Sequence, residues 1–209
     1  MTKFRFAVVV ALSGVISGCG STMDHAAHMG GDHTGMSGDH AAAGMASGSE
    51  RMSDPMFTAE MIPHHQAAID MAALAPARAE HPEIKTLAAN IGSAQASERE
   101  LMKRVGKENG WDPNAKMDHS GMSGMSKHEM GMDMDPADLK AAKPFDKAFI
   151  EMMVPHHQGA IRMAKHELSR GSDPQIRALA NRIIASQSKQ IEQMKQWYRD
   201  WYGSPLSVN

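Results

Sequence analysis

Apolar side chains recur along four stretches of the chain at the three- and four-residue spacing of an amphipathic helix. The stripe over residues 84–102 is the most regular of these stretches. Proline-containing breaks at residues 80–82 and 171–174 separate the stretches of each pair, and Gly-Ser-Pro at residues 203–205 ends the last one. The pattern predicts two helical hairpins, with helices of about 25 residues, or about 37 Å, each.

The helix starts are marked by short polar residues in front of proline. Ser53 or Asp54 before Pro55, and Asp173 before Pro174, have the arrangement of an N-cap followed by proline in the first turn. We therefore expect Ser53 or Asp54 to cap the first helix, and Asp173 to cap the last one.

The two predicted hairpins have closely similar sequences. A shift of 92 residues aligns residues 57–105 with residues 149–197 without a gap, and 20 of the 49 aligned positions are identical. Met-Ile-Pro-His-His-Gln at residues 61–66 corresponds to Met-Val-Pro-His-His-Gln at residues 153–158. The chain is therefore predicted to contain a tandem duplication. Two hairpins that each bury one face pack most economically as an all-α four-helix bundle.

The predicted organisation has six parts. They are a lipoprotein signal peptide with its lipobox at 1–19, a Met/His-rich tail at 20–53, the first hairpin at 54–111, a Met/His-rich linker at 112–142, the second hairpin at 143–203 and a C-terminal tail at 204–209. The Met/His-rich tail and the linker hold too few branched and aromatic side chains to offset the entropy of ordering their backbone. Both are therefore expected to be disordered without a ligand.

The N-terminus has the composition of an export signal. Lys3 and Arg5 precede an apolar run over residues 6–16, which is too short to span a bilayer. Ile-Ser-Gly-Cys at residues 16–19 resembles the bacterial lipobox, with Cys19 as the lipidated first residue of the mature chain. The predicted location is the bacterial cell envelope, lipid-anchored and facing the periplasm or extracytoplasmic space. An ordinary secretory signal with an unmodified cysteine is the alternative.

Composition narrows the function classes. The chain of 209 residues contains 20 Met and 12 His but a single Cys, and its formal net charge is −2. This balance gives no basic surface for nucleic acid, and one cysteine excludes a disulfide framework and Cys-based zinc sites. In an oxidising compartment methionine is the soft ligand that survives. Two of the histidines, His81 and His166, fall outside the repeated register and are expected at the surface.

The Met/His-rich tail and the linker are expected to capture copper, because a plain flexible spacer would consist of Gly, Ser and Pro. Residues 117–122 resemble the Met/His stretches of periplasmic copper-resistance proteins. The side chains expected to take part are Met23, His25, His28, Met29, His33, Met36, His40, Met117, His119, Met122, Met125, His128, Met130, Met132 and Met134.

Each repeated motif places two adjacent histidines one helical turn after a methionine. On a helical wheel, Met61, His64, His65 and Met71 share an arc about 120° wide that faces the core. Burial of two histidines is unfavourable unless their nitrogens find metal or hydrogen-bond partners. Met61 can serve the same ion as a neighbouring histidine, whereas Met71 lies about 15 Å further along the axis. The sequence leaves open whether the two histidine pairs share one site or form two.

The donor types select the ion. Thioether sulfur with imidazole suits Cu(I) and, to a lesser degree, Cu(II), whereas zinc sites usually recruit thiolate or carboxylate. Di-iron bundles need glutamates from all four helices, and this chain has Met152 where the first copy has Glu60. Copper is therefore the expected cofactor, with Cu(I) preferred over Cu(II).

The two His-His motifs, each followed by Leu-Ala-x-x-Ile and then Gln-x6-Met, resemble the domain-of-unknown-function family 305. The resemblance covers residues 57–105 and 143–202, and it implies a ferritin-like, all-helical envelope protein of a family in which some members bind copper. Differences between the copies, such as Arg99 against Ile191, argue against equal metal affinity in the two halves. The functional residues that the resemblance implies are His64, His65, His156, His157, Met61, Met153, Met71, Met163, Met102 and Met194.

Three function classes follow from these observations. The favoured one is an envelope-anchored lipoprotein, not an enzyme, that sequesters Cu(I) or hands it on and contributes to copper tolerance. Its partners would be copper ions, the membrane through Cys19 and a periplasmic copper-handling protein. A ferritin-like cuprous or di-metal oxidase would need an open coordination position and a placed acid or base, for which Glu60 and Glu98 are the candidates. The third is a structural envelope bundle without metal, in which the methionines only fill the core.

Overall fold

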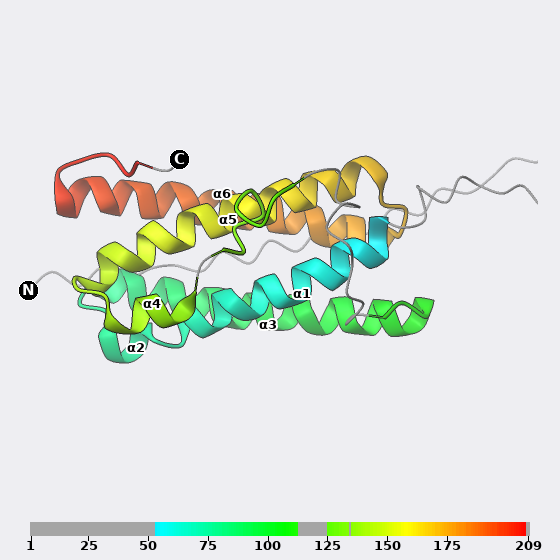
Figure 1. Cartoon of the computed structure of the whole chain (residues 1–209), viewed down its shortest axis with the longest axis horizontal. Helices are drawn as coiled ribbons and strands as arrows, with labels where there is room; N and C mark the ends of the chain where they lie inside the picture. The colour runs from blue at the N-terminus through cyan, green and yellow to red at the C-terminus, as the bar shows by residue number, and fades with distance from the viewer. Residues whose placement is uncertain (1–52, 113–124, 134, 208–209) are drawn as a thin grey trace, which may run out of the picture. The chain divides into compact units, whose positions relative to one another are not determined.

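The computed structural model describes residues 53–112, 125–133 and 135–207 (Figure 1). All of them belong to one compact unit, residues 43–209. The described residues form the helices α1 (Ser53–Ala72), α2 (Ala75–Arg78), α3 (Pro82–Asn109), α4 (Pro136–Ala141), α5 (Phe145–Arg170) and α6 (Pro174–Tyr202). None of these helices is long and apolar enough to cross a membrane.

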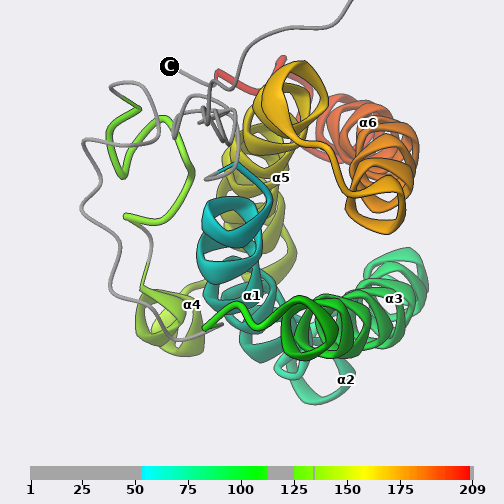
Figure 2. The same cartoon turned by 90° about the vertical axis from the view of Figure 1, so that its right-hand side faces the viewer.

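The four long helices form two hairpins that pack against each other. Helix α1 packs on α3 and α5 packs on α6, while α1 and α5 form the main contact between the hairpins (Figure 2). Helices α3 and α6 contact each other over a smaller area. The predicted all-α four-helix bundle is confirmed.

The connection in the first hairpin is more structured than a simple turn. Helix α1 ends at Ala72 after 20 residues, and the short helix α2 follows before α3 begins. A longer α1 would place Pro76 in its interior, at a cost of about 3 kcal/mol. By starting a new helix, the chain puts this proline in the first turn of α2, where its missing N–H is tolerated.

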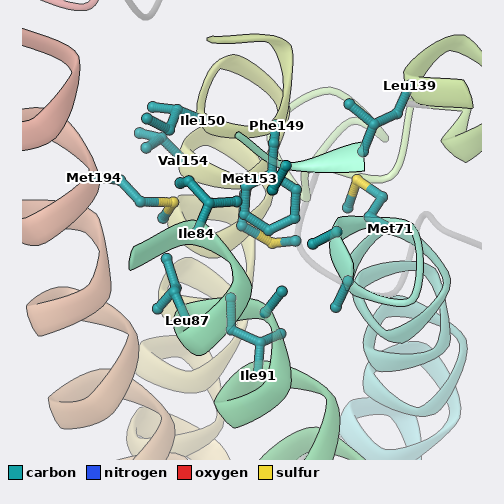
Figure 3. Packing of buried hydrophobic residues seen from close by; sticks show 14 of the residues in the cluster. Met71, Ile84, Leu87, Ile91, Leu139, Phe149, Ile150, Met153, Val154 and Met194 are labelled. Carbon is teal, nitrogen blue, oxygen red and sulfur yellow. The ribbon is translucent and has the colours of Figure 1, made fainter. Parts of the chain in front are cut away.

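Two apolar clusters form the core, and each draws on all four long helices. The Phe57 cluster contains Phe57, Met61, Met102, Met130, Met163, Ile176, Leu179 and Ile183 among its buried residues. The Phe149 cluster contains Met71, Ile84, Leu87, Ile91, Leu139, Phe149, Ile150, Met153, Val154 and Met194 (Figure 3). Along each long helix, one cluster takes one end and the other cluster takes the other end. The histidine pairs of α1 and α5 lie between them.

A buried aspartate at the start of each hairpin binds the loop of the other hairpin. The carboxylate of Asp54 accepts hydrogen bonds from the backbone N–H groups of Ser172 and Asp173, at 3.0 and 3.1 Å. The carboxylate of Asp146, exactly 92 residues later, accepts them from the N–H groups of Glu80 and His81, at 3.2 and 2.8 Å. We call these paired contacts the aspartate clasps. The two hairpins are therefore held together at both ends by equivalent contacts.

The clasps correct one sequence-based prediction. Asp54 was expected to cap its own helix, but its hydrogen bonds go to the loop between α5 and α6. The predicted cap at Asp173 is confirmed, since its side chain accepts from the N–H groups of Gln175 and Ile176. The predicted end of the last helix is also confirmed, because Gly203 has the left-handed conformation (φ 68°) of a C-terminal glycine.

Part of the predicted disordered linker is structured. Residues 125–133 form a compact turn, and helix α4 follows them with an N-cap at Asp135. Leu139 of α4 is fully buried in the Phe149 cluster. The expectation of disorder across the whole linker is therefore wrong for these residues, because single buried side chains anchor them to the bundle despite their polar composition.

Candidate metal centre

The two histidine pairs meet in one layer at the centre of the bundle. All four side chains are at most 1% exposed. The rings of His64 on α1 and His156 on α5 have their centroids 3.7 Å apart, with 35° between their planes. Each lies 6.3 Å from the ring of its neighbour in sequence, His65 or His157. Both histidine pairs therefore belong to one layer of the bundle.

In each hairpin, a side chain of the second long helix is hydrogen-bonded to the second histidine of the pair. Nε2 of His65 lies 2.7 Å from Oε2 of Glu98 on α3. Nε2 of His157 lies 2.7 Å from Oε1 of Gln190 on α6. Since both partner atoms are acceptors, each Nε2 carries a hydrogen, which leaves Nδ1 as the nitrogen through which either ring would bind a metal.

A segment of the linker, residues 125–133, covers the layer from the side of α1 and α5 that faces away from α3 and α6 (Figure 2). We call it the strap. Its Met130 side chain is fully buried in the Phe57 cluster. The carbonyl oxygen of Met130 accepts a hydrogen bond from Nε2 of His64 at 3.0 Å. The strap therefore supplies one wall of the histidine layer.

Glycine makes this close approach feasible. A Cβ atom on Gly159 of α5 would lie 1.9 Å from the carbonyl oxygen of Met130. On the strap, Gly131 has a left-handed backbone (φ 67°), and a Cβ there would lie 2.9 Å from Cα of His156. The side chain of Arg162 on α5 also donates to the carbonyl of Glu129. The strap thus fits this surface only because both glycines lack a side chain.

Five ring nitrogens in the layer have no hydrogen-bond partner among the described residues. They are Nδ1 of His64, His65, His156 and His157, and Nε2 of His156. A buried polar atom without a partner costs about 1–3 kcal/mol. Each neutral ring offers one lone-pair nitrogen, so a cation bound by the rings would remove most of that cost, and the layer fits a metal ion that accepts neutral imidazole.

Burial lowers the pKa of three of these histidines. Loss of hydration, reinforced by the neighbouring rings of His65 and His157, holds the pKa of His64 well below its ordinary value of 6.5. Burial and the ring of His64 do the same to the pKa of His156. Burial lowers the pKa of His157 to about 4, although its hydrogen bond with Gln190 acts in the opposite direction. All three rings are neutral at pH 7, and neutral imidazole is the form that binds metals.

The six predicted methionine ligands divide equally between the two apolar clusters. Met61, Met102 and Met163 belong to the Phe57 cluster, and Met71, Met153 and Met194 belong to the Phe149 cluster. The two sets occupy equivalent positions, and every member is at most 1% exposed. Figure 3 shows the second set among Phe149, Ile84 and Leu139, where packing alone accounts for burial. The separation expected between Met61 and Met71 is therefore present, since they lie in different clusters.

The described residues contain no group of three or more His, Cys, Asp or Glu side chains already arranged around a metal position. The close packing of the His64 and His156 rings, which are tilted by 35° to each other, is consistent with this, because the two rings lie against each other and not around a common point. Coordination in this layer therefore requires a ring rotation, a thioether donor or both.

Several residues with a place in the layer were not among the sequence-predicted ligands. Glu98 was expected only as an acid or base for the oxidase alternative, and Gln190 is its equivalent in the second hairpin; both follow three positions after Gln95 and Gln187 on the same helical stripes. Gln95 and Gln187 are themselves buried, and each has an Oε1 without a hydrogen-bond partner in the described part of the chain. The only sign of the role of Gly159 in the sequence is that the equivalent position in the first hairpin is an alanine, Ala67.

The predicted copper-capturing side chains divide into described and undescribed ones. Met130 is buried, Met125 and Met132 are half-buried against the Phe57 cluster, and His128 is exposed with its Nδ1 2.8 Å from Oδ2 of Asp133. The lipidation site and the remaining capture residues lie outside the described residues: Cys19, Met23, His25, His28, Met29, His33, Met36, His40, Met117, His119, Met122 and Met134.

The two histidines outside the repeated register are partly exposed. The ring of His81 stacks on Trp201 with centroids 3.7 Å apart, and its Nδ1 lies 2.7 Å from Oδ2 of Asp146 in one of the clasps. His81 therefore lies partly at the surface and also contributes to a clasp. His166 is half-buried, and burial lowers its pKa.

Comparison with solved structures finds proteins of the same fold. CopM in its Cu(I)-bound form is 41% identical, with a TM-score of 0.62 over 72% of this chain and 98% of CopM. The Cu(II)-bound form of CopM is 44% identical, with a TM-score of 0.60 over 71% of this chain and 97% of CopM. A secreted DUF305 protein from Streptomyces coelicolor shares the fold, with a TM-score of 0.68, 23% identity and coverage of 77% of this chain and 98% of that one.

One curated sequence is also similar. The uncharacterized protein L153 of Acanthamoeba polyphaga mimivirus is 45% identical over 49 residues, which are 23% of this chain. This chain spans about a third (32%) of the length of that protein. The model of the domain of unknown function DUF305 matches residues 54–198, which is more than half of the chain. The chain belongs to the DUF305 family.

Proposed function

We propose that this chain is a copper-binding protein that sequesters Cu(I) or hands it on through histidine and methionine ligands. The observation that carries the proposal is the buried histidine layer, in which five ring nitrogens have no hydrogen-bond partner within the described part of the chain. The similarity to CopM, which has been solved with Cu(I), Cu(II) and silver, supports copper as the ion.

The chemistry of the donors favours the monovalent ion. Neutral imidazole and thioether sulfur are the ligands that Cu(I) accepts most readily. Three rings are neutral at pH 7 because burial lowers their pKa values. The methionine sets of the two apolar clusters flank the layer at both ends of the bundle. Cu(II) would draw more on the imidazole nitrogens.

Binding without turnover is part of the proposal. An oxidase would need a free acid or base next to an open coordination position. The carboxylate of Glu98 already accepts a hydrogen bond from His65 at 2.7 Å, and its equivalent in the second hairpin is the neutral Gln190. Oxygen consumption by the Cu(I)-loaded protein, measured with an oxygen electrode, would assign the enzymatic alternative instead.

We further propose that the mature protein is attached to the bacterial envelope through a lipid on Cys19, where it contributes to copper tolerance. The support is the lipobox-like sequence at residues 16–19 after a short apolar run. Mass spectrometry of the membrane fraction should show a lipidated N-terminal peptide, and Cys19→Ala should release the protein from that fraction. An unmodified N-terminus beginning after a different cleavage site would contradict the anchor.

The decisive experiment is an anaerobic Cu(I) titration of residues 20–209 against a chromophoric competing chelator. Wild-type protein should bind at least one Cu(I) tightly. Replacement of His64, His65, His156 and His157 by asparagine should remove that tight class, whereas the matched control His166→Asn should keep it. A quadruple variant that titrates like wild type would show that the histidine layer is not the site.

The same titration separates the core from the Met/His-rich tail. Removal of residues 20–53 should lower the number of bound Cu(I) ions while the tight class remains. The tail would then act as a collector for the histidine layer. Loss of the tight class in the truncated protein would contradict this division of roles.

A further inference from the structure

The two halves of the histidine layer have the same geometry but different charge. His65 is held by Glu98 and His157 by Gln190, each at 2.7 Å. The two partners are 92 residues apart and occupy equivalent positions on α3 and α6. A negative charge therefore stands behind one ring, and a neutral amide stands behind the other.

The negative charge is close to the layer and only weakly hydrated. The side chain of Glu98 is 16% exposed, and the His65 side chain is fully buried. In this setting a carboxylate that accepts from the Nε2–H of an imidazole makes its Nδ1 a stronger electron donor. It also offsets the charge of a bound cation, and the offset is larger for a divalent than for a monovalent ion.

We propose that Glu98 is a positioning residue that makes the His65 half of the layer prefer Cu(II) more strongly than the His157 half does. This inference rests on the proposed copper-binding function. Glu98 lowers the Cu(II)/Cu(I) reduction potential of its half, whereas Gln190 leaves the other half as the better Cu(I) site. The duplicated scaffold thus carries two electronically different half-sites.

The test exchanges the two partners. Loss of a second-shell partner typically lowers metal affinity 10–100-fold, so Glu98→Gln should weaken Cu(II) binding by about that factor and Cu(I) binding much less. The reduction potential should rise by about 59 mV for each tenfold difference. Gln190→Glu should lower the potential, and the double exchange should return it towards the wild-type value. Both affinities are measured by competition, and the potential by spectroelectrochemistry.

The outcomes separate the inference from the function on which it rests. Tight copper binding by wild type, with a potential unchanged in Glu98→Gln, would overturn the role of Glu98 and leave the function intact. If Glu98→Gln lowered the Cu(I) and Cu(II) affinities equally, the contact with His65 would be merely structural, and the proposed role of Glu98 would be overturned. A wild-type protein that binds no copper would overturn both.

A different observation supports a second inference, which concerns the strap. The Met130 carbonyl accepts from Nε2 of His64, whereas neither ring nitrogen of His156 has a hydrogen-bond partner among the described residues. The strap itself is held as a unit, since Glu129 accepts from the N–H and hydroxyl of Ser126, at 2.7 and 3.0 Å. It lies against the layer on the two glycines described above.

We infer that the strap gates access of copper to the histidine layer, which again rests on the proposed function. Gly159→Ala puts a methyl group where the Met130 carbonyl lies and should displace the strap without altering any histidine. Gly92→Ala is the matched control, because its added Cβ meets nothing within 4 Å. A contact worth about 1.4 kcal/mol corresponds to a tenfold change in rate. Stopped-flow Cu(I) transfer from a chelator should therefore be about tenfold faster in Gly159→Ala and unchanged in Gly92→Ala.

Tryptic cleavage after Lys127 reports independently whether the strap is displaced. Gly131→Val, which adds a side chain at a left-handed backbone position beside His156, is a second route to displacement. Faster cleavage with faster transfer in either variant supports the gate. Faster cleavage with unchanged transfer, or cleavage as slow as wild type in both variants, would overturn it.

Discussion

The two hairpins share a plan but differ on the two sides of the histidine layer. At the ends of the bundle they are equivalent, since Asp54 and Asp146 each bind the loop of the opposite hairpin. At the layer, glutamate stands against glutamine on one side, and Ala67 stands against Gly159 on the other. The two hairpins are thus equivalent at the ends of the bundle, where they hold each other, and differ in the residues that surround the histidine layer.

This comparison separates two kinds of constraint. Equivalent clasps, clusters and histidines position the layer in the same way from both halves. The strap can occupy one copy of its surface only, because the equivalent position in the first hairpin carries a Cβ atom, on Ala67. Asymmetry therefore follows from the linker as well as from point differences between the copies.

The largest effect on stability should come from the core and should be equal in the two halves. Met102→Ala and Met194→Ala each delete a fully buried side chain at equivalent positions, and each should cost about 2–5 kcal/mol. Leucine at the same positions should cost less than about 1.5 kcal/mol, so it separates the loss of volume from the loss of sulfur. Urea denaturation of the metal-free protein measures both. A cost confined to one half would show that the clusters are not equivalently packed.

Acid should destabilise the fold through the neutral histidines. Below pH 6.5 these histidines bind protons in the unfolded chain but stay neutral in the folded one. The free energy of unfolding therefore has its full value above pH 6.5 and decreases as the pH falls. The slope is about 1.4 kcal/mol per pH unit for each histidine. His157 has a pKa of about 4 in the fold, so at pH 5 it alone should cost about 2 kcal/mol.

Urea midpoints of the metal-free protein at pH 7, 6 and 5 test this dependence. His157→Gln should reduce the slope between pH 7 and pH 5. Midpoints that do not change between pH 7 and pH 5 would contradict the neutral, buried state of these rings.

Loss of a clasp should have a somewhat smaller effect. Asp54→Ala and Asp146→Ala each leave two loop N–H groups without their acceptor, which should cost about 1–3 kcal/mol. The two variants should lose similar amounts, because each loop also loses a side-chain contact, from the hydroxyl of Ser172 or from the ring of His81. Hydrogen exchange should speed up at residues 172–173 in the first variant and at residues 80–81 in the second. Faster exchange in the same hairpin as the mutation would contradict the crossed arrangement.

The fold was accessible from the sequence because it depends on periodicity and on repetition. The stripe over residues 84–102 and the 92-residue shift predict the helices and their pairing. The clasps were not accessible, since Asp54 before Pro55 has the pattern of a local cap and its real partners are more than a hundred residues away. Local patterns identify a capping residue but not the helix or loop that it binds.

The candidate site was accessible in its residue types but not in its geometry. Two His-His motifs at core-facing positions predict buried imidazoles, yet only the crossing of α1 and α5 brings His64 against His156. The strap was missed because composition describes an average over residues. One buried side chain, Met130, and one absent side chain, at Gly159, are enough to fix a segment that composition predicts to be disordered.

The smallest effect should be a gain in stability, at a position where the halves differ without consequence for the layer. Gly92 lies inside α3, its equivalent in α6 is Ile184, and a Cβ added to it meets nothing within 4 Å. Glycine in a helix interior costs about 0.5–1 kcal/mol relative to alanine, so Gly92→Ala should raise the free energy of unfolding by that amount. Copper affinity should stay at the wild-type value. Gly159→Ala adds the same methyl group to a helix interior and should bring the same gain from helix propensity. Any further difference in the free energy of unfolding between the two variants therefore measures the contribution of the strap contact. Equal gains in stability from both would mean that the strap contact has no energetic weight.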